Sequence, residues 1–296
     1  MDRKQTRQVL DRYRITSGKG FRLRDHDPGN TGGSAIQEED GEELLRQGVA
    51  RLSELQELLF ANQSWSLLCV LQAMDAAGKD GTIKHVMSGI NPQGVTVAPF
   101  RAPGPEDLAH DFLWRINRHL PADGQIGIFN RSHYEEVLVT RVHPEILAHE
   151  RIPPALVGKH FWRHRLDDIA AWERYLHRQG TVVVKFFLNV SKAEQKRRFI
   201  DRLDHPAKNW KFSAGDIAER GHWNEYQQAY EAAISATATK DAPWYVVPAD
   251  HKWFTRFVVV AAIVEALEAL DLKPVKLSDE ELGKLAAARR QLETEG

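Results

Sequence analysis

A lysine framed by two glycines follows the first strongly apolar run of the sequence. The run LLCVLQAM, residues 67–74, stops at Asp75, and the stretch Gly-Lys-Asp-Gly-Thr follows two alanines later, at residues 78–82. Glycines let a backbone come close to an anion, and a helix beginning near Lys79 would point unpaired N–H groups and its positive end at this turn. Lys79 would neutralise phosphoryl oxygens, while Asp75 could hold or orient Mg²⁺. These residue types therefore predict a site for phosphoryl transfer.

The match to the general phosphate-loop pattern is imperfect. That pattern has Gly, four further residues and then Gly-Lys-Ser/Thr. In this chain Ala73 stands at the first position, Asp80 follows the lysine, and Thr82 comes two residues late. A glycine-rich capped turn with a solvated lysine therefore stays open as the structural alternative. Under the phosphate-site hypothesis, the binding positions in this turn are Ala77, Gly78, Asp80, Gly81, Thr82 and Lys84.

A second set of polar residues follows the third apolar run, in the segment IGIFNRSHYEE at residues 126–136. The end of this run would lie beside the end of the first run in a doubly wound parallel sheet, where ligands bind. Arginine pairs bidentately with phosphate oxygens, and a carboxylate binds metal or accepts a proton. We therefore favour Arg131 and Glu135 as partners of the first turn. The predicted catalytic residues are Asp75, Lys79, Arg131 and Glu135, with Asp75 and Glu135 as metal ligands.

A third set of candidates lies in the basic run KAEQKRRFIDRLDHPAKNWKF, residues 192–212. Two arginines four residues apart would share one face of a helix. A solvated helix face is the ordinary explanation for such a run. Its position before the stretch 203–221, which Pro and Gly break, favours a phosphate channel beneath a mobile cover. The phosphate-binding candidates in this run are Arg198, Arg202, Lys208 and Lys211.

Short apolar runs alternate with amphipathic stretches after residue 40, which is typical of an α/β fold. Several runs are almost wholly apolar, as parallel strands covered on both faces require. We expect a three-layer α/β/α domain with a five-stranded parallel sheet, with strands at 66–72, 95–100, 125–129, 181–188 and 244–247. The expected helices are 41–61, 106–119, 159–179, 193–203, 222–237, 253–270 and a last one from 278.

The ends of the chain differ in composition from its middle. Residues 1–40 are polar and rich in Gly, Asp and Arg, so we expect an arm without its own core, ahead of the folded chain. We expect one domain over residues 41–272 and a charged C-terminal helix or tail over residues 273–296.

Charge and hydropathy limit the classes of partner. The chain has 296 residues, and its 40 Lys and Arg nearly balance its 41 Asp and Glu, so the overall charge favours neither nucleic acid nor an anionic membrane as partner. The N-terminus lacks the apolar segment of a signal peptide, and no apolar run approaches the length of a membrane span. We therefore expect a soluble cytoplasmic protein. The single cysteine, Cys69, lies in an apolar run and is expected to be a buried thiol.

The motifs in this order resemble those of the polyphosphate kinase type 2 family, over about residues 21–270. They are QAMDAAGKDGTIKHV, INPQGVTVAPFRAPGPEDLAHDFLWRI, GIFNRSHYEEVLVTRV, KFFLNVSKAEQKRRFIDRL, NWKFSAGD and APWYVVPADHKWF. The resemblance implies a phosphate-loop kinase fold with a helical lid at about 203–221. It also implies phosphoryl transfer between inorganic polyphosphate and nucleotides with Mg²⁺ or Mn²⁺. The family's first motif, Asp-x-x-Gly-Lys-x-Gly, is matched by Asp75, Gly78, Lys79 and Gly81.

The second motif of that family often begins Asp-Arg-Ser, whereas this chain has Asn130 before Arg131 and Ser132. The change argues against a metal ligand at position 130. With this change the motif resembles that of the family's third subgroup, whose members phosphorylate both nucleoside mono- and diphosphates. In that subgroup a glutamate at the position of Glu135 is associated with accepting both. The resemblance thus implies AMP, ADP and ATP as ligands and a homo-oligomer, dimer or tetramer. An ATP-dependent nucleotide kinase and a non-catalytic polyphosphate or nucleotide sensor stay open as alternatives.

Overall fold

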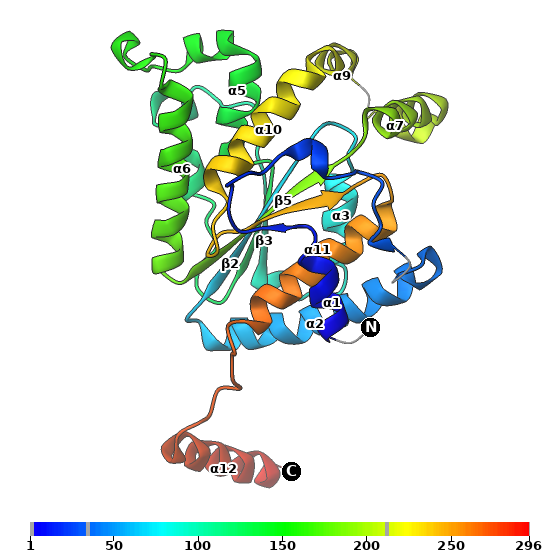
Figure 1. The fold of residues 1–296 in the computed structure, drawn as a ribbon. Helices are drawn as coiled ribbons and strands as arrows, with labels where there is room; N and C mark the ends of the chain where they lie inside the picture. The colour runs from blue at the N-terminus through cyan, green and yellow to red at the C-terminus, as the bar shows by residue number, and fades with distance from the viewer. Residues whose placement is uncertain (1–2, 34–35, 211–212, 296) are drawn as a thin grey trace.

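The computed structural model describes residues 3–33, 36–210 and 213–295, and a mostly parallel sheet lies at its centre (Figure 1). Six strands are hydrogen-bonded in the order β1-β6-β5-β2-β4-β3. Neighbouring strands are parallel except for β1, which runs antiparallel to β6. The strands are β1 (Arg14–Ile15), β2 (Ser66–Ala73), β3 (Val95–Pro99), β4 (Ile126–Asn130), β5 (Thr181–Asn189) and β6 (Trp244–Pro248).

The five predicted parallel strands are confirmed as β2 to β6. The sixth strand, β1, was not predicted, because its two residues Arg-Ile form no apolar run. β2 is buried along its whole length, as a strand covered on both faces must be. Because β2 pairs in parallel with β4 on one side and β5 on the other, the carboxyl ends of these three strands meet at one edge of the sheet.

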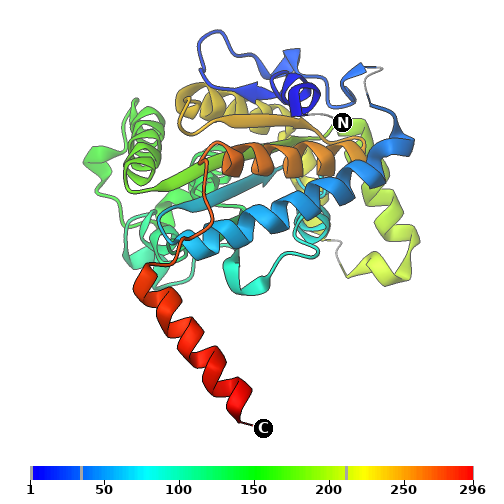
Figure 2. The ribbon, with the colours of Figure 1, turned by 90° about the horizontal axis from the view of Figure 1, so that it is seen from below.

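Helices cover both faces of the sheet and give the predicted three layers (Figures 1 and 2). On one side α11 contacts α1, α2 and α3, and on the other α10 contacts α5 and α6. The first group is α1 (Arg3–Leu10), α2 (Gly41–Asn62), α3 (Lys79–Val86) and α11 (Lys252–Glu268). The second group is α5 (Val139–Val142), α6 (Phe161–Arg178) and α10 (Trp223–Thr237).

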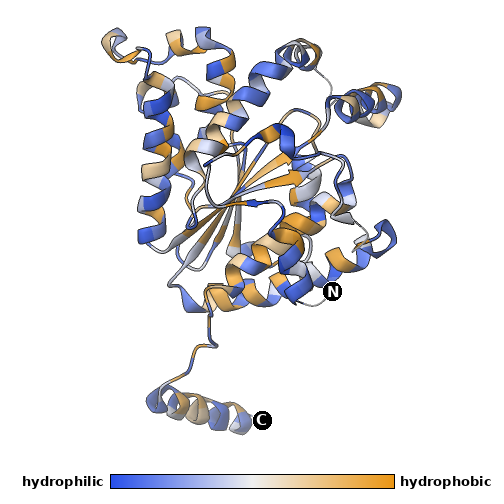
Figure 3. Cartoon of the chain, viewed as in Figure 1, coloured by the Kyte–Doolittle hydropathy of each residue, from blue (hydrophilic) through white to orange (hydrophobic). Residues whose placement is uncertain are grey.

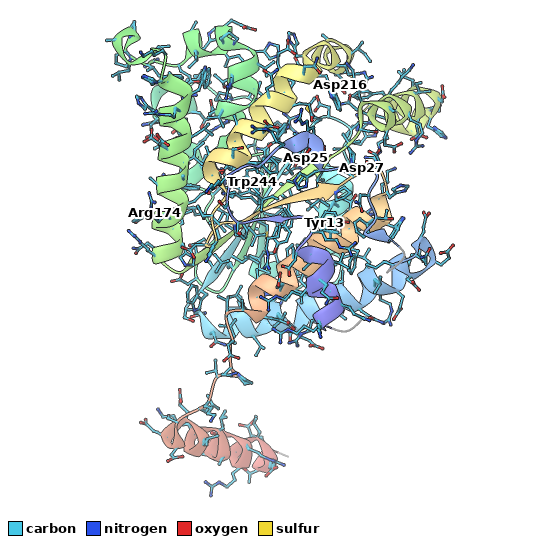
Figure 4. The ribbon with its side chains drawn as sticks, viewed as in Figure 1. Tyr13, Asp25, Asp27, Arg174, Asp216 and Trp244 are labelled. Atoms are coloured by element: carbon cyan, nitrogen blue, oxygen red, sulfur yellow. The ribbon has the colours of Figure 1, made fainter. Side chains whose placement is uncertain are left out.

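Hydropathy follows this layering (Figure 3). The strands and α11 are mostly hydrophobic in that view, whereas the outer helix α6 alternates hydrophilic and hydrophobic residues along its length. The core includes Trp244 of β6, whose ring is fully buried and donates its Nε1–H to Thr237 Oγ1 at 2.9 Å (Figure 4). Cys69 is also fully buried, as predicted, and burial raises the pKa of its thiol.

The predicted helix over residues 106–119 is wrong. In its place the chain forms a short 3-10 helix, η5 (Asp107–Ala109), and one turn of α-helix, α4 (Trp114–Asn117). Each of two aspartates starts a separate turn through its side chain, so the segment forms two short pieces in place of one helix. Asp107 accepts from the N–H of Gly104 at 2.9 Å, and Asp111 accepts from the N–H of Leu113 at 3.0 Å.

The described part of the N-terminal arm packs on the domain, although we expected folding to begin after it. Val9, Leu10 and Tyr13 are buried in the main core, and the Tyr13 ring meets the ring of Phe254 edge-on at 5.6 Å (Figure 4). The expectation failed because these apolar residues are too widely spaced among charged ones to form a recognisable pattern. The division of the chain at residues 40 and 272 stays a prediction.

The remaining helices lie at the edges of the domain or beyond it. α7 (Lys192–Asp204), α8 (Pro206–Asn209) and α9 (Ala214–Glu219) follow β5, and α12 (Asp279–Thr294) stands apart from the domain (Figures 1 and 2). The described residues contain no helix that is both long and apolar enough to cross a membrane. The other 3-10 helices are η1 (Leu23–Asp25), η3 (Glu38–Asp40), η4 (Pro92–Gly94), η6 (His133–Val137), η7 (Pro144–His149), η8 (Pro154–Leu156) and η9 (Arg220–His222).

Candidate active site

The glycine-framed lysine comes directly after a turn, residues 74–78, that joins β2 to α3; we call this turn the phosphate-loop turn. Ala76 and Gly78 both have left-handed backbones, with φ of 59° and 107°. Gly78 is the N-cap of α3, which begins at Lys79 as the sequence predicted. The turn therefore directs the N-terminus of α3 beyond the carboxyl end of β2, where an anion would meet its unpaired N–H groups.

Lys79 folds back over the phosphate-loop turn. Its Nζ donates to the carbonyl oxygen of Ala73 at 3.0 Å. Desolvation and the neighbouring cation Arg131 lower the pKa of Lys79 to about 8, although the carboxylates of Asp75 and Glu135 oppose that shift. A phosphate bound at this turn would add negative charge beside Lys79 and so favour its protonated form.

Arg131 joins the two predicted carboxylates. It donates to Asp75 Oδ1 at 3.1 Å and to Glu135 Oε2 at 3.0 Å. The carboxylate of Glu135, followed by that of Asp75, raises the pKa of Arg131 despite its partial burial. The residues predicted from the ends of the first and third apolar runs thus lie together, as adjacent parallel strands require.

The backbone around Arg131 is held in an unusual conformation by its neighbours. Arg131 has a φ of 64°, a region that non-glycine residues seldom occupy and that is enriched at functional sites. The next residue, Ser132, caps η6 by accepting from the N–H of Tyr134 at 3.1 Å, and it receives a hydrogen bond from Gln72 Nε2 at 3.0 Å. These buried bonds fix the direction in which Arg131 leaves the sheet.

Asn130 has a contact that an aspartate could not make. Its Nδ2 donates to Asp80 Oδ1 at 2.7 Å, which links the end of β4 to the first turn of α3. An aspartate at this position would place a second carboxylate against Asp80. The departure from the family's usual Asp-Arg-Ser motif therefore has a structural role.

Arg198 is bound to the protein rather than free to meet a ligand in this conformation. Its side chain is 5% exposed, and all five of its N–H donors have protein acceptors, at 2.6 to 3.2 Å. We predicted a phosphate contact, but no donor remains for one in this conformation. In this conformation Arg198 holds the phosphate-loop turn through Ala76 and Ala77, and its contact with phosphate stays a prediction. The acceptors are the Glu194 carboxylate and the carbonyl oxygens of Ala76, Ala77, Ala249 and Asp250.

A cavity of about 650 Å³, which we call the cationic cavity, opens at the carboxyl edge of the sheet. The phosphate-loop turn and the start of α3 form its floor, so the predicted positions Ala77, Gly78, Asp80, Gly81 and Thr82 all line it. Seven of its lining residues are basic: Lys79, Arg101, Arg131, Arg198, Arg202, Lys252 and Arg256. Such a lining suits an extended polyanion.

Sequence reasoning missed three of these basic residues, Arg101, Lys252 and Arg256. Arg101 follows β3, and the other two lie in the first turns of α11, which follows β6. The rule that ligands bind beyond the carboxyl ends of parallel strands applies to these strands as well. That rule, applied also to the ends of the predicted strands 95–100 and 244–247, would have identified the positions.

The remaining phosphate-binding candidates have different positions. Arg202 lines the cationic cavity and lies 3.7 Å from Asp216 of the lid helix α9, which is labelled in Figure 4. Lys84 is exposed on α3 and does not line the cationic cavity. Lys208 belongs to α8, and Lys211 lies outside the described residues. Their contact with phosphate stays a prediction.

A second cavity of about 440 Å³, which we call the apolar cavity, lies on the other side of Arg131. Phe100, Arg101 and Arg131 line both cavities, so the two meet at these side chains. Glu135 lines only the second of the two. The apolar side chains that line this second cavity include Phe100, Leu108, Phe112, Val139 and Ile146.

The donor set fits a metal that arrives with phosphate. Across residues 3–33, 36–210 and 213–295, no group of three or more His, Cys, Asp or Glu side chains could hold a metal ion by itself. Mg²⁺ commonly binds through one or two carboxylates and completes its shell with water and substrate phosphates. Asp75 lines the cationic cavity and supplies such a carboxylate, whereas Glu135 faces the apolar cavity.

Comparison with known proteins supplies the family. The profile of the family described as Polyphosphate kinase 2 (PPK2) matches residues 35–274. The chain is 51% identical over 251 residues to the ADP-polyphosphate phosphotransferase of Rhodopseudomonas palustris, across 84% of this chain and 87% of that protein. It is 45% identical over 268 residues to the AMP/ADP-polyphosphate phosphotransferase of Meiothermus ruber, across 89% of this chain and 95% of that protein.

A solved structure shares the whole architecture. The crystal structure of Polyphosphate Kinase 2 from Arthrobacter aurescens TC1 superposes with a TM-score of 0.86 at 42% identity, and the match covers 98% of this chain and 97% of that one. The phosphate-loop kinase fold expected from the sequence is thereby confirmed. From the profile match and these similarities, the chain belongs to the polyphosphate kinase 2 family.

Proposed function

We propose that this protein reversibly transfers the terminal phosphoryl group of inorganic polyphosphate to AMP and ADP, giving ADP and ATP. The observation that carries the proposal is the junction of two unlike cavities at Arg131. The cationic cavity suits a chain of phosphates that has no base to recognise. The apolar cavity suits the base and ribose of a nucleotide, with Arg101 and Arg131 between the two.

The choice of acceptor is the finer part of the proposal. The name of the Rhodopseudomonas palustris relative mentions ADP, whereas that of the Meiothermus ruber relative mentions both AMP and ADP. We assign both acceptors to this chain because Glu135 stands at the position associated with dual use. The hydrogen bond from Arg131 to Glu135 connects the wall of the apolar cavity to the place where the phosphoryl group would be transferred.

The transfer step needs positioning and charge neutralisation more than covalent chemistry by the protein. Lys79 and the N–H groups at the start of α3 neutralise the transferred phosphoryl group. Arg131, braced between Asp75 and Glu135, orients the acceptor phosphate towards it. A Mg²⁺ or Mn²⁺ ion held by Asp75 and phosphate oxygens supplies further neutralisation when bound. The acceptor phosphate is already anionic near neutral pH, so no general base is required.

We assign the lid to the segment after α7. Residues 203–221 include α8 and α9, and Trp210 and Asp216 from this segment line the cationic cavity. Closure over bound polyphosphate would exclude water and prevent hydrolysis of the donor. The contact between Arg202 and Asp216 lies at the base of this lid.

The test measures ADP and ATP formation with Mg²⁺ and polyphosphate, supplying AMP or ADP separately and omitting each component in turn. The proposal predicts product from both acceptors. ATP from ADP with no product from AMP would refute the AMP assignment. Activity with ATP as the sole effective donor would favour the nucleotide kinase alternative, and polyphosphate binding without any product would favour the sensor. Assembly into dimers or tetramers is a separate prediction.

A further inference from the structure

The junction of the two cavities has two sides, which come from different strands. Arg131 follows β4 and is braced by two carboxylates, whereas Phe100 and Arg101 follow β3. The N–H of Phe100 donates to the carbonyl oxygen of Asn130 at 3.0 Å, and the next residue, Arg101, lies outside the sheet. The position of Arg101 therefore depends on contacts beyond the strand ladder.

The side chain of Arg101 is exposed and lines both cavities. Unlike Arg131, its guanidinium forms no ion pair with any residue that the structure describes. A phosphate at the junction can therefore take its N–H donors without displacing a carboxylate. The place from which this guanidinium reaches the phosphate then depends on how the backbone of Arg101 is held.

Arg115 of α4 holds that backbone. Its Nη1 donates to the carbonyl oxygen of Arg101 at 2.8 Å, and its guanidinium carbon lies 5.8 Å from the centre of the Phe100 ring. Arg115 is only 8% exposed, so these contacts are made in surroundings where water competes little for the guanidinium. One buried side chain thus contacts both residues that form the β3 side of the junction.

The same guanidinium is tied to the β4 side through Glu136 of η6. Arg115 Nη2 donates to Glu136 Oε1 at 3.2 Å, and Thr140 donates to Glu136 Oε2 at 3.2 Å. Glu136 is buried and follows Glu135 directly, so this ion pair reaches the 3-10 helix that carries the predicted acceptor-site glutamate. Arg165 of α6 fixes the backbone of that helix by donating to the carbonyl oxygen of Glu136 at 2.9 Å. Arg115 therefore bridges the two sides of the junction.

We propose that Arg115 is a positioning residue for the nucleotide: with Glu136 it fixes Arg101 relative to Arg131, and so sets where Arg101 meets the acceptor phosphate. This inference rests on the proposed function, because the nucleotide is the acceptor of that reaction. Arg115 also lines the apolar cavity, so direct contact with the nucleotide is the rival explanation that the test must separate.

A double-mutant cycle on the Kd for ADP, measured by titration calorimetry with the full-length protein, tests this coupling. Lysine cannot supply the planar fork that bonds both Arg101 and Glu136, so Arg115→Lys should raise that Kd about fivefold or more. In an Arg101→Ala background the same substitution should change the Kd less than about twofold, because the group through which Arg115 acts is gone. A full effect in both backgrounds would show direct contact or general support of the fold, and would overturn the proposal.

Arg118→Lys is the matched control, because Arg118 lies just after α4, stacks over the Trp114 ring at 4.7 Å and lines neither cavity. It should leave the Kd for ADP unchanged. If circular dichroism shows that Arg115→Lys does not fold, Glu136→Gln replaces it in the cycle, and its effect should likewise disappear in the Arg101→Ala background.

The Kd is measured without turnover, so this inference and the proposed function can fail separately. Binding of ADP without ATP formation from polyphosphate would refute the proposed function, while the cycle would still decide the role of Arg115. Normal turnover of the native protein with additive effects of Arg115→Lys and Arg101→Ala would refute the positioning role alone.

Discussion

The guanidinium of Arg198 donates to the carbonyl oxygen of Ala77 at 2.7 Å, which ties α7 to the phosphate-loop turn. The same side chain also reaches the carbonyl oxygen of Ala249, beyond the end of β6. The shape of the phosphate-loop turn therefore depends on a residue far from it in the sequence, in the helix that precedes the lid.

Replacing this arginine by lysine tests the positioning role. Arg198→Lys keeps the charge but cannot supply five N–H donors in a planar array. We expect turnover to fall about tenfold or more, because a misplaced loop loses transition-state contacts, while the apparent affinity for polyphosphate changes less. Arg197→Lys on the exposed side of α7 is the matched control. Turnover of Arg198→Lys equal to that of the control would contradict this role.

Lys79 and Lys84 lie on the same helix but in different surroundings. Lys79 lines the cationic cavity, whereas Lys84 is exposed outside it. We expect Lys79→Ala to lower turnover by about 10²-fold or more while the protein stays folded, because one preorganised charge at the transferred group is lost. Lys84→Ala should have little effect. Steady-state kinetics with circular dichroism distinguish the two, and near-normal turnover of Lys79→Ala would argue against the loop assignment.

The pH dependence should also report on Lys79. Its pKa of about 8 means that the free enzyme loses this positive charge as pH rises through that value. We therefore expect kcat/KM to fall on the alkaline side of about pH 8, while kcat falls at higher pH because bound polyphosphate favours the charged form. Lys79→Arg, which stays protonated, should shift the fall in kcat/KM to higher pH. A fall at the same pH in Lys79→Arg would assign the titration to another group.

Arg202 should affect the binding of long donors. It lines the cationic cavity one helical turn beyond Arg198. We expect Arg202→Glu to raise the KM for long polyphosphate several-fold more than the KM for short donors, because a long chain extends further along the basic lining. Arg197→Glu makes the same charge change on the exposed side of α7. Equal increases for long and short donors would indicate that Arg202 contacts only the reacting end.

A buried ion pair between β5 and α6 should affect stability. Lys185 of β5 is fully buried against Glu173 of α6, and Tyr134 also donates to Glu173, at 2.7 Å. Glu173→Gln leaves a buried ammonium without its counter-charge, so we expect a loss of about 3–5 kcal/mol in the free energy of unfolding by urea. The double variant Lys185→Met/Glu173→Leu removes both charges and should recover much of that loss. A single variant as stable as the native protein would show that the pair contributes little.

The parts of the site that follow from strand ends could be predicted from the sequence. Asp75 and Lys79 follow one buried strand, while Arg131 and Glu135 follow its neighbour, so the parallel pairing of β2 and β4 brings them together. The length of the apolar runs was enough to locate these strands in the sequence. The catalytic and metal-binding roles of these residues stay predictions until turnover is measured.

Other features depend on tertiary contacts that no local pattern contains. A basic helix face predicts phosphate contact for Arg198 and Arg202 alike, and only packing against Ala76 and Ala77 separates their roles. The break in the predicted helix 106–119 depends on two aspartates whose side chains bond the backbone. The sequence pattern did not reveal that each aspartate starts a turn of its own.

The pairing of β1 with β6 has a consequence for synthesis of the chain. Arg14 pairs with Tyr245, and Ile15 with Trp244, so β1 leaves the ribosome long before the strand with which it pairs. Until β6 emerges, Tyr13 and its apolar neighbours have no core to enter. Nascent chains that stop before residue 244 should therefore bind chaperones through their N-terminal segment, and release should coincide with completion of the sheet.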